Sequence, residues 1–332
     1  MIAQPATGGI DGTGSDGENR TIVVALGGNA LLPAGERGDI HDQFAHTRES
    51  LAPIVALARA GWRIALVHGN GPQVGDELFR NEMARAELPP LPLGVLVAAT
   101  AGWIGYMIQQ SLQNALERAG IRRDVITVIT QTVVAQDDPA LSRPTKFIGH
   151  HLTAARKDAL AAQGVAVGKD KGGTWRRLTA SPFPIGIVEA EAVRQLVEAG
   201  TIVVACGGGG PPVYSDLRLG WEGVDAVVDK DRTAAILARA LDAEILLILT
   251  DIEGVYRDFG TPSAVPIRTM TVGEAERMMA AGQLGEGSMR PKVEAGVAFV
   301  RAGGRRAIIA ELGSGPAALR GETGTTIMAE GQ

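Results

Sequence analysis

The chain has 332 residues, of which 45% are hydrophobic, and its formal net charge is −5. This composition excludes a disordered chain, and the absence of a basic cluster argues against a nucleic-acid surface. The single cysteine, Cys206, excludes an intrachain disulfide and favours a reducing, cytoplasmic compartment. The length is typical of one large or two modest domains.

Predicted strands and helices alternate along the first part of the chain. Residues 1–20 are polar and glycine-rich, so we expect a disordered extension rather than a signal peptide. The hydrophobic periodicity then predicts strand 21–26, helix 43–60, strand 63–68, helix 73–86, helix 94–119 and strand 124–130. The stretch 88–116 lacks charge, but its apolar middle is short for the roughly 20 residues of a membrane span. We expect a buried or interface helix there and no membrane association.

The alternation stops in one long segment and then resumes. Residues 137–186 contain several prolines and no long apolar strand, which predicts a small inserted subdomain or lid. Beyond it we predict helix 189–199, strand 201–206, helix 229–241, strand 244–249, helices 271–281 and 291–302, strand 306–310 and a strand near 325–328. Strands joined by helical crossovers indicate a three-layer αβα sandwich with a mainly parallel central sheet.

Three of the predicted strands run straight into glycine-rich turns. Their turns begin at Gly27, at Gly69 and, after Cys206, at Gly207. Consecutive glycines bring backbone N–H groups together without a Cβ in the way, which suits a phosphoryl group or another small anion. We expect Gly69 and Gly71 to need positive φ angles or a close approach of ligand to backbone. Glycine pairs also close ordinary loops, but three in one parallel sheet favour a shared ligand.

Charged residues next to these turns are the second indication of a site. Asp229 and Asp231 flank Lys230 at a helix start, where carboxylates are also ordinary capping groups. Lys292 follows a Gly-Ser turn and Pro291, which fits either a phosphate cradle or a normal helix start with a solvent lysine. Lys146 in the inserted segment is, taken alone, typical of a solvated lysine.

Other candidate side chains fit structural roles better. His68 ends a buried strand and is interpreted as a hydrogen-bonding group, and Cys206 as a small core residue rather than a nucleophile. The sequence contains no P-loop, no dinucleotide fingerprint, no protein-kinase set and no zinc-ligand spacing. Lysines held by an aspartate beside glycine loops nevertheless suit phosphoryl transfer, which needs positioning and positive charge more than covalent help. Asn side chains could orient a small planar acceptor.

Taken in order, these segments resemble the amino-acid-kinase fold and, within it, the carbamate kinase family. The matching motifs are ALGGNA (25–30), VHGNGPQVG (67–75), PTKFIG (144–149), WRR (175–177), CGGGGP (206–211), VDAVVDKD (224–231), LTD (249–251) and GSMRPK (287–292). The resemblance covers essentially all of residues 21–310. One departure is Ala101, where many relatives have Gln after the Thr; it concerns the expected dimer helix.

The resemblance implies a cytoplasmic homodimer that interconverts ATP plus carbamate with ADP plus carbamoyl phosphate, using Mg²⁺. The family habit is ATP formation in catabolism, as in an arginine deiminase-type pathway. It further implies a carbamate-binding lobe at 21–222, containing the protruding subdomain 137–186, and a nucleotide-binding lobe at 223–332.

Site residues are implied motif by motif. Carbamate and the moving phosphoryl group would meet Gly27, Gly28, Asn29, Gly69, Asn70, Gly71, Gly208 and Gly209. The catalytic set would be Lys146, Lys230 and Lys292, which neutralise phosphate charge, with Asp231 organising them. The nucleotide would meet Thr250, Asp251, Tyr256, Gly287, Ser288 and Met289. No residue is expected to bind a metal directly.

Two other functions remain open at this point. Another kinase of the same fold could act on a different small carboxylate, phosphonate or nucleotide. A non-catalytic nucleotide-binding subunit would be expected to lack the lysine set, yet Lys230 and Lys292 are both present.

Overall fold

A computed structural model describes residues 20–28, 38–284 and 289–331. Its main sheet has eight strands in the order β15-β17-β16-β12-β1-β2-β9-β3. In that order the strands are Thr269–Thr271, Thr325–Met328, Arg306–Glu311, Ile245–Thr250, Thr21–Leu26, Arg63–His68, Ile202–Val204 and Val125–Thr127. All neighbouring pairs are parallel except β16 with β17. The prediction of a mainly parallel sheet is confirmed.

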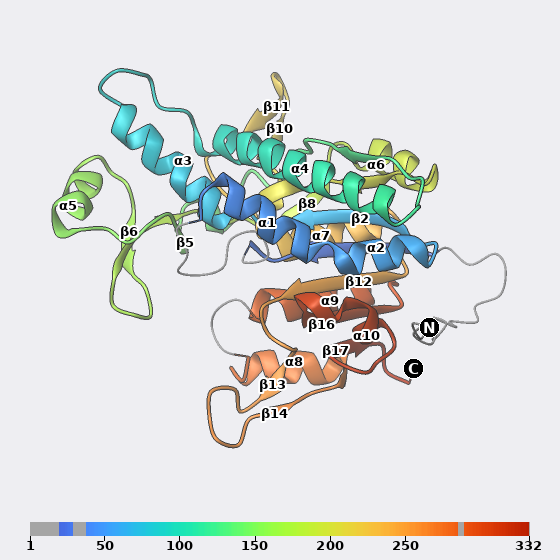
Figure 1. The fold of residues 1–332 in the computed structure, drawn as a ribbon. Coiled ribbons are helices and arrows are strands. Elements are labelled where there is room, and N and C mark those ends of the chain that lie inside the picture. The colour runs from blue at the N-terminus through green and yellow to red at the C-terminus, as the bar shows by residue number, and fades with distance from the viewer. Residues whose placement is uncertain (1–19, 29–37, 285–288, 332) are drawn as a thin grey trace.

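Helices cover both faces of this sheet (Figure 1). Side chains alternate along β1, so that Ile22 and Val24 pack in one apolar cluster and Val23 and Ala25 in the other. The first cluster includes residues of α2 (Ala52–Arg59), α4 (Leu93–Arg118) and α10 (Gly315–Leu319), with α1 (Ile40–Ser50) packed beside it. The second includes residues of α6 (Ala190–Glu198), α7 (Lys230–Ala240), α8 (Val272–Ala280) and α9 (Met289–Arg301). This is the expected three-layer sandwich.

The prediction of a single helix at 43–60 is wrong in one respect, because the structure has two helices there. α1 ends at Ser50, and α2 begins at Ala52 with Pro53 in its first turn. Proline has no N–H to donate and its ring clashes with a continuing helix, so the chain starts a new helix there.

A second, four-stranded sheet was not predicted. Its order is β11-β10-β4-β8, with bounds Gly220–Gly223, Pro212–Asp216, Thr132–Val134 and Pro184–Ile187. These strands are only three to five residues long, and three of them contain proline or glycine, so their periodicity is weak. Smaller elements are the hairpin β13 (Tyr256–Arg257) and β14 (Val265–Pro266), and the 3₁₀ turns η2 (Pro139–Leu141), η3 (Gly207–Gly209) and η4 (Leu312–Ser314).

A small unit protrudes from the body beyond α3 (Gly71–Ala84), at the left of Figure 1. It consists of the antiparallel sheet β5-β7-β6 (Lys146–Ile148, Trp175–Thr179, Val167–Lys169) and α5 (Ala154–Ala162). We call residues 145–179 the protruding unit. β8 falls within the predicted insertion 137–186 but pairs with β4 in the four-stranded sheet. The predicted lobe and insertion boundaries stay predictions.

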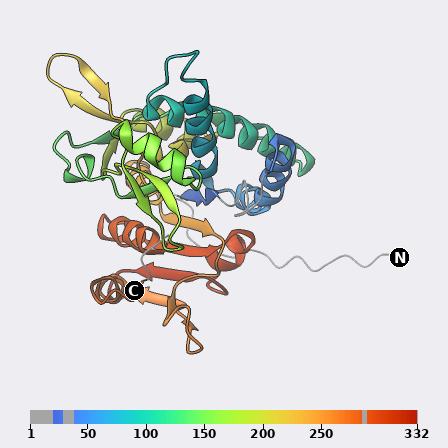
Figure 2. The same ribbon diagram turned by 90° about the vertical axis from the view of Figure 1, so that its left-hand side faces the viewer.

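The C-terminal elements gather at one end of the molecule. Figure 2 shows them in orange and red below, with the blue, green and yellow elements above. Among the described residues, no helix is long and apolar enough to cross a membrane.

Candidate active site

The glycine turns meet at one edge of the main sheet. β1 and β2 are adjacent and parallel, so their carboxyl ends lie side by side. The Gly69 N–H donates to Leu26 O at 3.0 Å, and a Cβ on Gly69 would lie 2.9 Å from Gly28 N. The turns after these two strands therefore touch each other through backbone that only glycine allows.

The third turn, η3, is the one that requires left-handed backbone. Cys206 has φ 53°, Gly208 67° and Gly209 89°. The carbonyl of Gly209 accepts from the Thr132 and Thr233 hydroxyls at 2.6 and 3.2 Å, which holds the turn in place. We expected positive φ angles as one possibility at Gly69 and Gly71, but neither residue has a positive φ. For Gly69 the close approach of Gly28 explains the glycine instead.

Asp231 joins two lysines beside these turns. Lys230 Nζ lies 2.5 Å from Asp231 Oδ1, and Lys292 Nζ lies 3.1 Å from Asp231 Oδ2. Asp231 and Lys292 are only 3% and 5% exposed. Burial, with the nearby charge of Lys230, lowers the pKa of Lys292, and Asp231 opposes this shift. One carboxylate thus organises two ammonium groups from the starts of α7 and α9.

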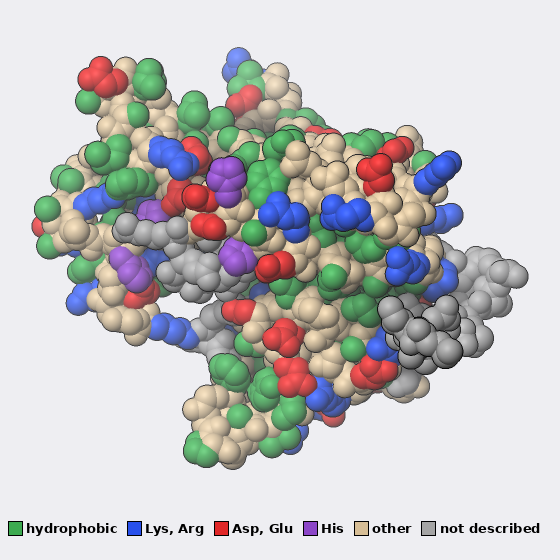
Figure 3. All heavy atoms as spheres, in the orientation of Figure 1, with side chains coloured by type: hydrophobic (Ala, Val, Ile, Leu, Met, Phe, Trp, Pro, Cys, Tyr) green, Lys and Arg blue, Asp and Glu red, His purple; other side chains and the backbone are tan. Residues whose placement is uncertain are grey.

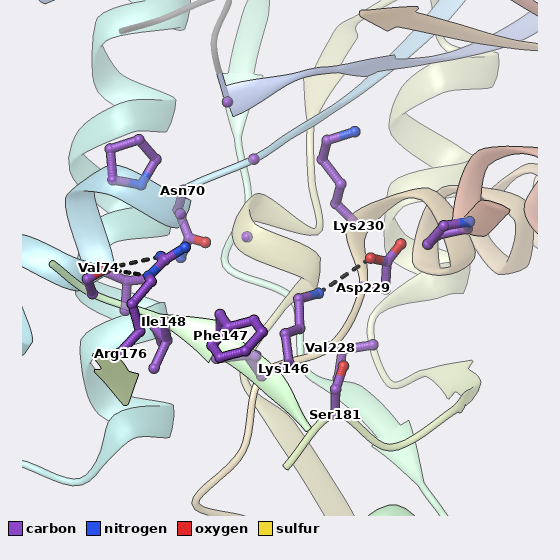
Figure 4. A pocket seen from close by; sticks show the side chains of 18 of the residues that line it. Asn70, Val74, Lys146, Phe147, Ile148, Arg176, Ser181, Val228, Asp229 and Lys230 are labelled. Atoms are coloured by element: carbon purple, nitrogen blue, oxygen red, sulfur yellow. Dashed lines mark hydrogen bonds and ion pairs between the residues drawn. The ribbon is translucent and has the colours of Figure 1, made fainter. Parts of the chain in front are cut away.

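Lys146 reaches the same place from the protruding unit. Its Nζ lies 3.1 Å from Asp229 Oδ2 (Figure 4), while Asp229 Oδ1 accepts from the backbone N–H groups of Asp231 and Arg232. Asp229 is therefore both the N-cap of α7 and an ion-pair partner. Burial opposes its charge, but Lys146 and Lys230 outweigh burial and hold the pKa of Asp229 well below its usual range.

These groups face one large cavity of about 1870 Å³. Of the predicted site residues, it is lined by Gly28, Gly69, Asn70, Gly71, Lys146, Gly208, Lys230, Asp231 and Lys292. Gly27 and Gly209 do not line it. The first donates from its N–H to Leu249 O at 3.0 Å, and the second anchors η3.

Charged contacts join the protruding unit to α3 on the other wall of the cavity. Glu82 pairs with Arg156 and, at 3.4 Å, with Arg177. His150 Nε2 lies 2.6 Å from an oxygen of Asp76. Figure 3 shows histidine side chains both on the protruding unit, at the left, and on the neighbouring part of the body. The unit that carries Lys146 is thus held to α3 by these polar contacts and by Ile148, which packs in one buried apolar cluster with Val74 and Leu78 of α3.

Four predicted nucleotide residues lie outside this cavity. Thr250 ends β12, and its hydroxyl donates to Asp251 at 3.0 Å. Tyr256 follows in β13, and Met289 begins α9. Because β12 is adjacent to β1, Thr250 lies next to Gly27, where a Cβ on the glycine would come within 3.8 Å of Thr250 Cα. Asn29, Gly287 and Ser288 lie outside the described residues.

Sequence reasoning missed some residues of the cavity wall and interpreted two others correctly. Asp229 was noted beside Lys230 but left out of the implied catalytic set, and Arg176, which donates to Gly149 O at 2.8 Å, was not singled out. His68 is completely buried, and burial lowers its pKa to about 4, so it is a neutral structural group. Burial raises the pKa of Cys206 to about 12, which excludes a reactive thiolate. Ala101 is buried against η3, where a Cβ on Gly207 would lie 2.8 Å from the Ala101 Cβ.

The side chains of this site provide few direct ligands for a metal ion. Within the described part of the chain, no three His, Cys, Asp or Glu side chains come together as a metal site. Both oxygens of Asp231 are already paired with lysines. The described residues therefore suit a divalent cation only where phosphate and water oxygens supply most of its ligands.

Comparison with known proteins identifies the class. The family model described as "Amino acid kinase family" matches residues 20–311. The chain therefore belongs to the amino acid kinase family, a class of phosphotransferases.

Its relatives narrow the class further. The chain is 42% identical over 309 residues to carbamate kinase of Pyrococcus horikoshii, covering 92% of this chain and 98% of the relative. It is 45% identical over 309 residues to carbamate kinase of Halobacterium salinarum, covering 92% and 97%. The solved structure of carbamate kinase from Giardia lamblia bound to AMP-PNP superimposes with a TM-score of 0.87 at 35% identity, covering 94% of this chain and 99% of that one. These relatives place the chain among the carbamate kinases.

Proposed function

We propose that this protein catalyses reversible phosphoryl transfer between ATP and carbamate, giving ADP and carbamoyl phosphate, and that it works in the ATP-forming direction in catabolism. The observation that carries the proposal is the Asp231 bridge between Lys230 and Lys292 beside the glycine turns. Relatives named carbamate kinase at 40–45% identity support the choice of acceptor.

In the proposed reaction a carboxylate oxygen of carbamate attacks the γ-phosphorus of ATP. A new O–P bond forms as the bond to the β,γ-bridging oxygen breaks, and ADP leaves with that electron pair. Lys146, Lys230 and Lys292 neutralise the charge on the transferring group, and Asp231 holds the last two in position. Around carbamate we place Gly27, Gly28, Asn29, Gly69, Asn70, Gly71, Gly208 and Gly209.

For the nucleotide we propose the loop after β12 and the start of α9. The residues are Thr250, Asp251, Tyr256, Gly287, Ser288 and Met289. The Giardia lamblia relative was solved with AMP-PNP, which supports a nucleotide site in this fold. Mg²⁺ would enter with the phosphates and supply further positive charge; the chain's own part is to hold the lysines and exclude water.

We also propose a cytoplasmic homodimer. α4 and β3 pack closely, since a Cβ on Gly105 would lie 2.2 Å from a Thr127 methyl. On α4 itself, Val95 and Tyr106 are 48% and 55% exposed, and their spacing of eleven residues puts them on the same face of the helix. Large apolar side chains exposed near one packed surface are typical of an oligomer interface. Analytical ultracentrifugation at micromolar concentration would give a monomer mass if this part of the proposal is wrong.

The test is product identification. Purified protein is incubated with MgATP and ammonium carbamate, and ³¹P NMR follows the phosphorus species. Carbamoyl phosphate and ADP should appear together, and parallel incubations with acetate, glutamate and nucleoside monophosphates should give no phosphorylated product. Phosphorylation of one of those acids, with none of carbamate, would contradict the proposal.

A further inference from the structure

A buried hydroxyl on α4 lies behind Asn70. Thr100 is completely buried and is not part of the cavity wall. Its Oγ1 accepts from Asn70 Nδ2 at 2.9 Å, although the two residues are 30 positions apart. Asn70 itself lines the cavity beside Gly69 and Gly71. A residue outside the cavity thus contacts one end of a side chain inside it.

The surroundings of Thr100 fix the direction of this hydrogen bond. Its Oγ1 lies 2.8 Å from Leu96 O and 3.0 Å from Val97 O, both of which can only accept. A hydroxyl has one proton, and here it is used by the helix carbonyls, so only a lone pair is left for Asn70. In keeping with this, Asn70 turns its amino group toward Thr100.

The amide oxygen of Asn70 is consequently turned to the other side. In Figure 4 it points toward the part of the cavity that holds Lys146 and Lys230. Gly208 packs against the amide, because a Cβ there would lie 2.1 Å from Asn70 Nδ2. Between Thr100 and Gly208 the amide has little room to rotate. The lysines offer the ligand only donors, whereas Asn70 presents an uncharged acceptor.

We propose that Thr100 is a positioning residue. It holds the amide of Asn70 so that the amide oxygen accepts a hydrogen bond from the N–H group of the substrate. This inference rests on the proposed function and deepens it. The site would select acids and acyl phosphates that carry an N–H donor beside the carboxyl carbon, and reject those with a methyl group there. A site that hydrogen-bonds one group rejects an analogue lacking that group, since its own polar atom is then left unpaired.

The test compares two acyl phosphates that differ at this position. Wild-type, Thr100→Val and Thr100→Ser proteins are assayed for ATP formation at saturating ADP, with carbamoyl phosphate and with acetyl phosphate. Thr100→Val has nearly the same shape but no hydroxyl, so its kcat/KM for carbamoyl phosphate should fall by about 10- to 100-fold. With acetyl phosphate kcat/KM should change much less, so selectivity falls; KM for ADP should not change. Thr100→Ser should keep the selectivity.

Several outcomes would overturn the inference. Thr100→Val with wild-type selectivity would mean that the hydroxyl does not set the amide. Equal losses with both acyl phosphates, accompanied by a lower Tm in Thr100→Ser as well, would mean a structural role only. Thr100→Ala gives the same comparison if valine prevents folding. Failure of the proposed function would instead show in the wild-type protein, as no turnover of carbamoyl phosphate.

Discussion

Asp231 and Lys292 form a buried ion pair with 3.1 Å between Oδ2 and Nζ, and Lys230 shares the same carboxylate. Asp231→Asn would remove the carboxylate that pairs directly with the buried Lys292. Breaking a buried pair from one side typically costs about 3–5 kcal/mol, so we expect a loss of this order in the free energy of unfolding, together with a large fall in kcat. Urea unfolding of the variant, beside the exposed control Asp137→Asn, measures it. Unfolding within error of wild type would show that the pair is not what holds Lys292 in place.

The glycines on either side of Asn70 should respond differently to an added methyl group. A Cβ on Gly69 would lie 2.9 Å from Gly28 N and 3.3 Å from Lys230 Cδ, whereas a Cβ on Gly71 meets no atom within 4 Å. We expect Gly69→Ala to lower both Tm and activity. Gly71→Ala should keep the wild-type Tm and lose activity only because its methyl group enters the cavity. Thermal melts and ATP-formation rates check this, and a fully active Gly71→Ala protein would mean that this turn does not contact the ligand.

Much of this architecture could be predicted because the local sequence pattern of the main strands agrees with their pairing in the folded sheet. The strands β1, β2, β12 and β16 are continuous apolar runs of the kind that parallel sheets require. The four-stranded sheet was missed because its strands are only three to five residues long and three of them contain proline or glycine. For such strands, pairing partners decide the structure rather than local propensity.

The candidate site could be predicted where a motif places its residues next to each other. The Lys146–Asp229 pair joins residues 83 positions apart, and the capping role of Asp229 gave no reason to look for a second partner. Thr100 could not be found at all, since a threonine inside an apolar helix carries no signal of its own. Only the fold places it behind Asn70.

The neutral His68 predicts a specific pH dependence of stability. Its pKa falls from 6.5 to about 4 on folding because of burial. Between these values the unfolded chain binds a proton that the folded protein does not, so stability is complete above pH 6.5 and is lost as pH falls toward 4. The contribution of one such group is about 1.4 kcal/mol per pH unit in that range.

His68→Gln should therefore show a flatter pH dependence of the free energy of unfolding than wild type between pH 6.5 and 4. Chemical unfolding at a series of pH values measures the two slopes. Equal slopes for wild type and His68→Gln would show that His68 is protonated in the folded protein.

The protruding unit should be separable from the body. Its ends meet where the Thr145 N–H donates to Thr179 O at 3.2 Å, so a short Gly-Ser linker can replace residues 146–178. We expect a folded protein that still binds nucleotide but has almost no turnover, because Lys146 and the exclusion of water are lost. Circular dichroism, calorimetric ADP titration and ATP formation check the three parts. Aggregation of the shortened chain would mean that the unit belongs to the structural core.

The most direct test of the central claim is the rate of ATP formation from ADP and carbamoyl phosphate by purified wild-type protein and by Lys230→Ala. The wild-type protein should form ATP. Loss of one donor to the transferring group typically lowers the rate by about 10²- to 10³-fold, so the variant should lose kcat to this extent with little change in KM for ADP. No ATP from the wild-type protein, or a variant with near-normal kcat and only a raised KM for ADP, would contradict the account.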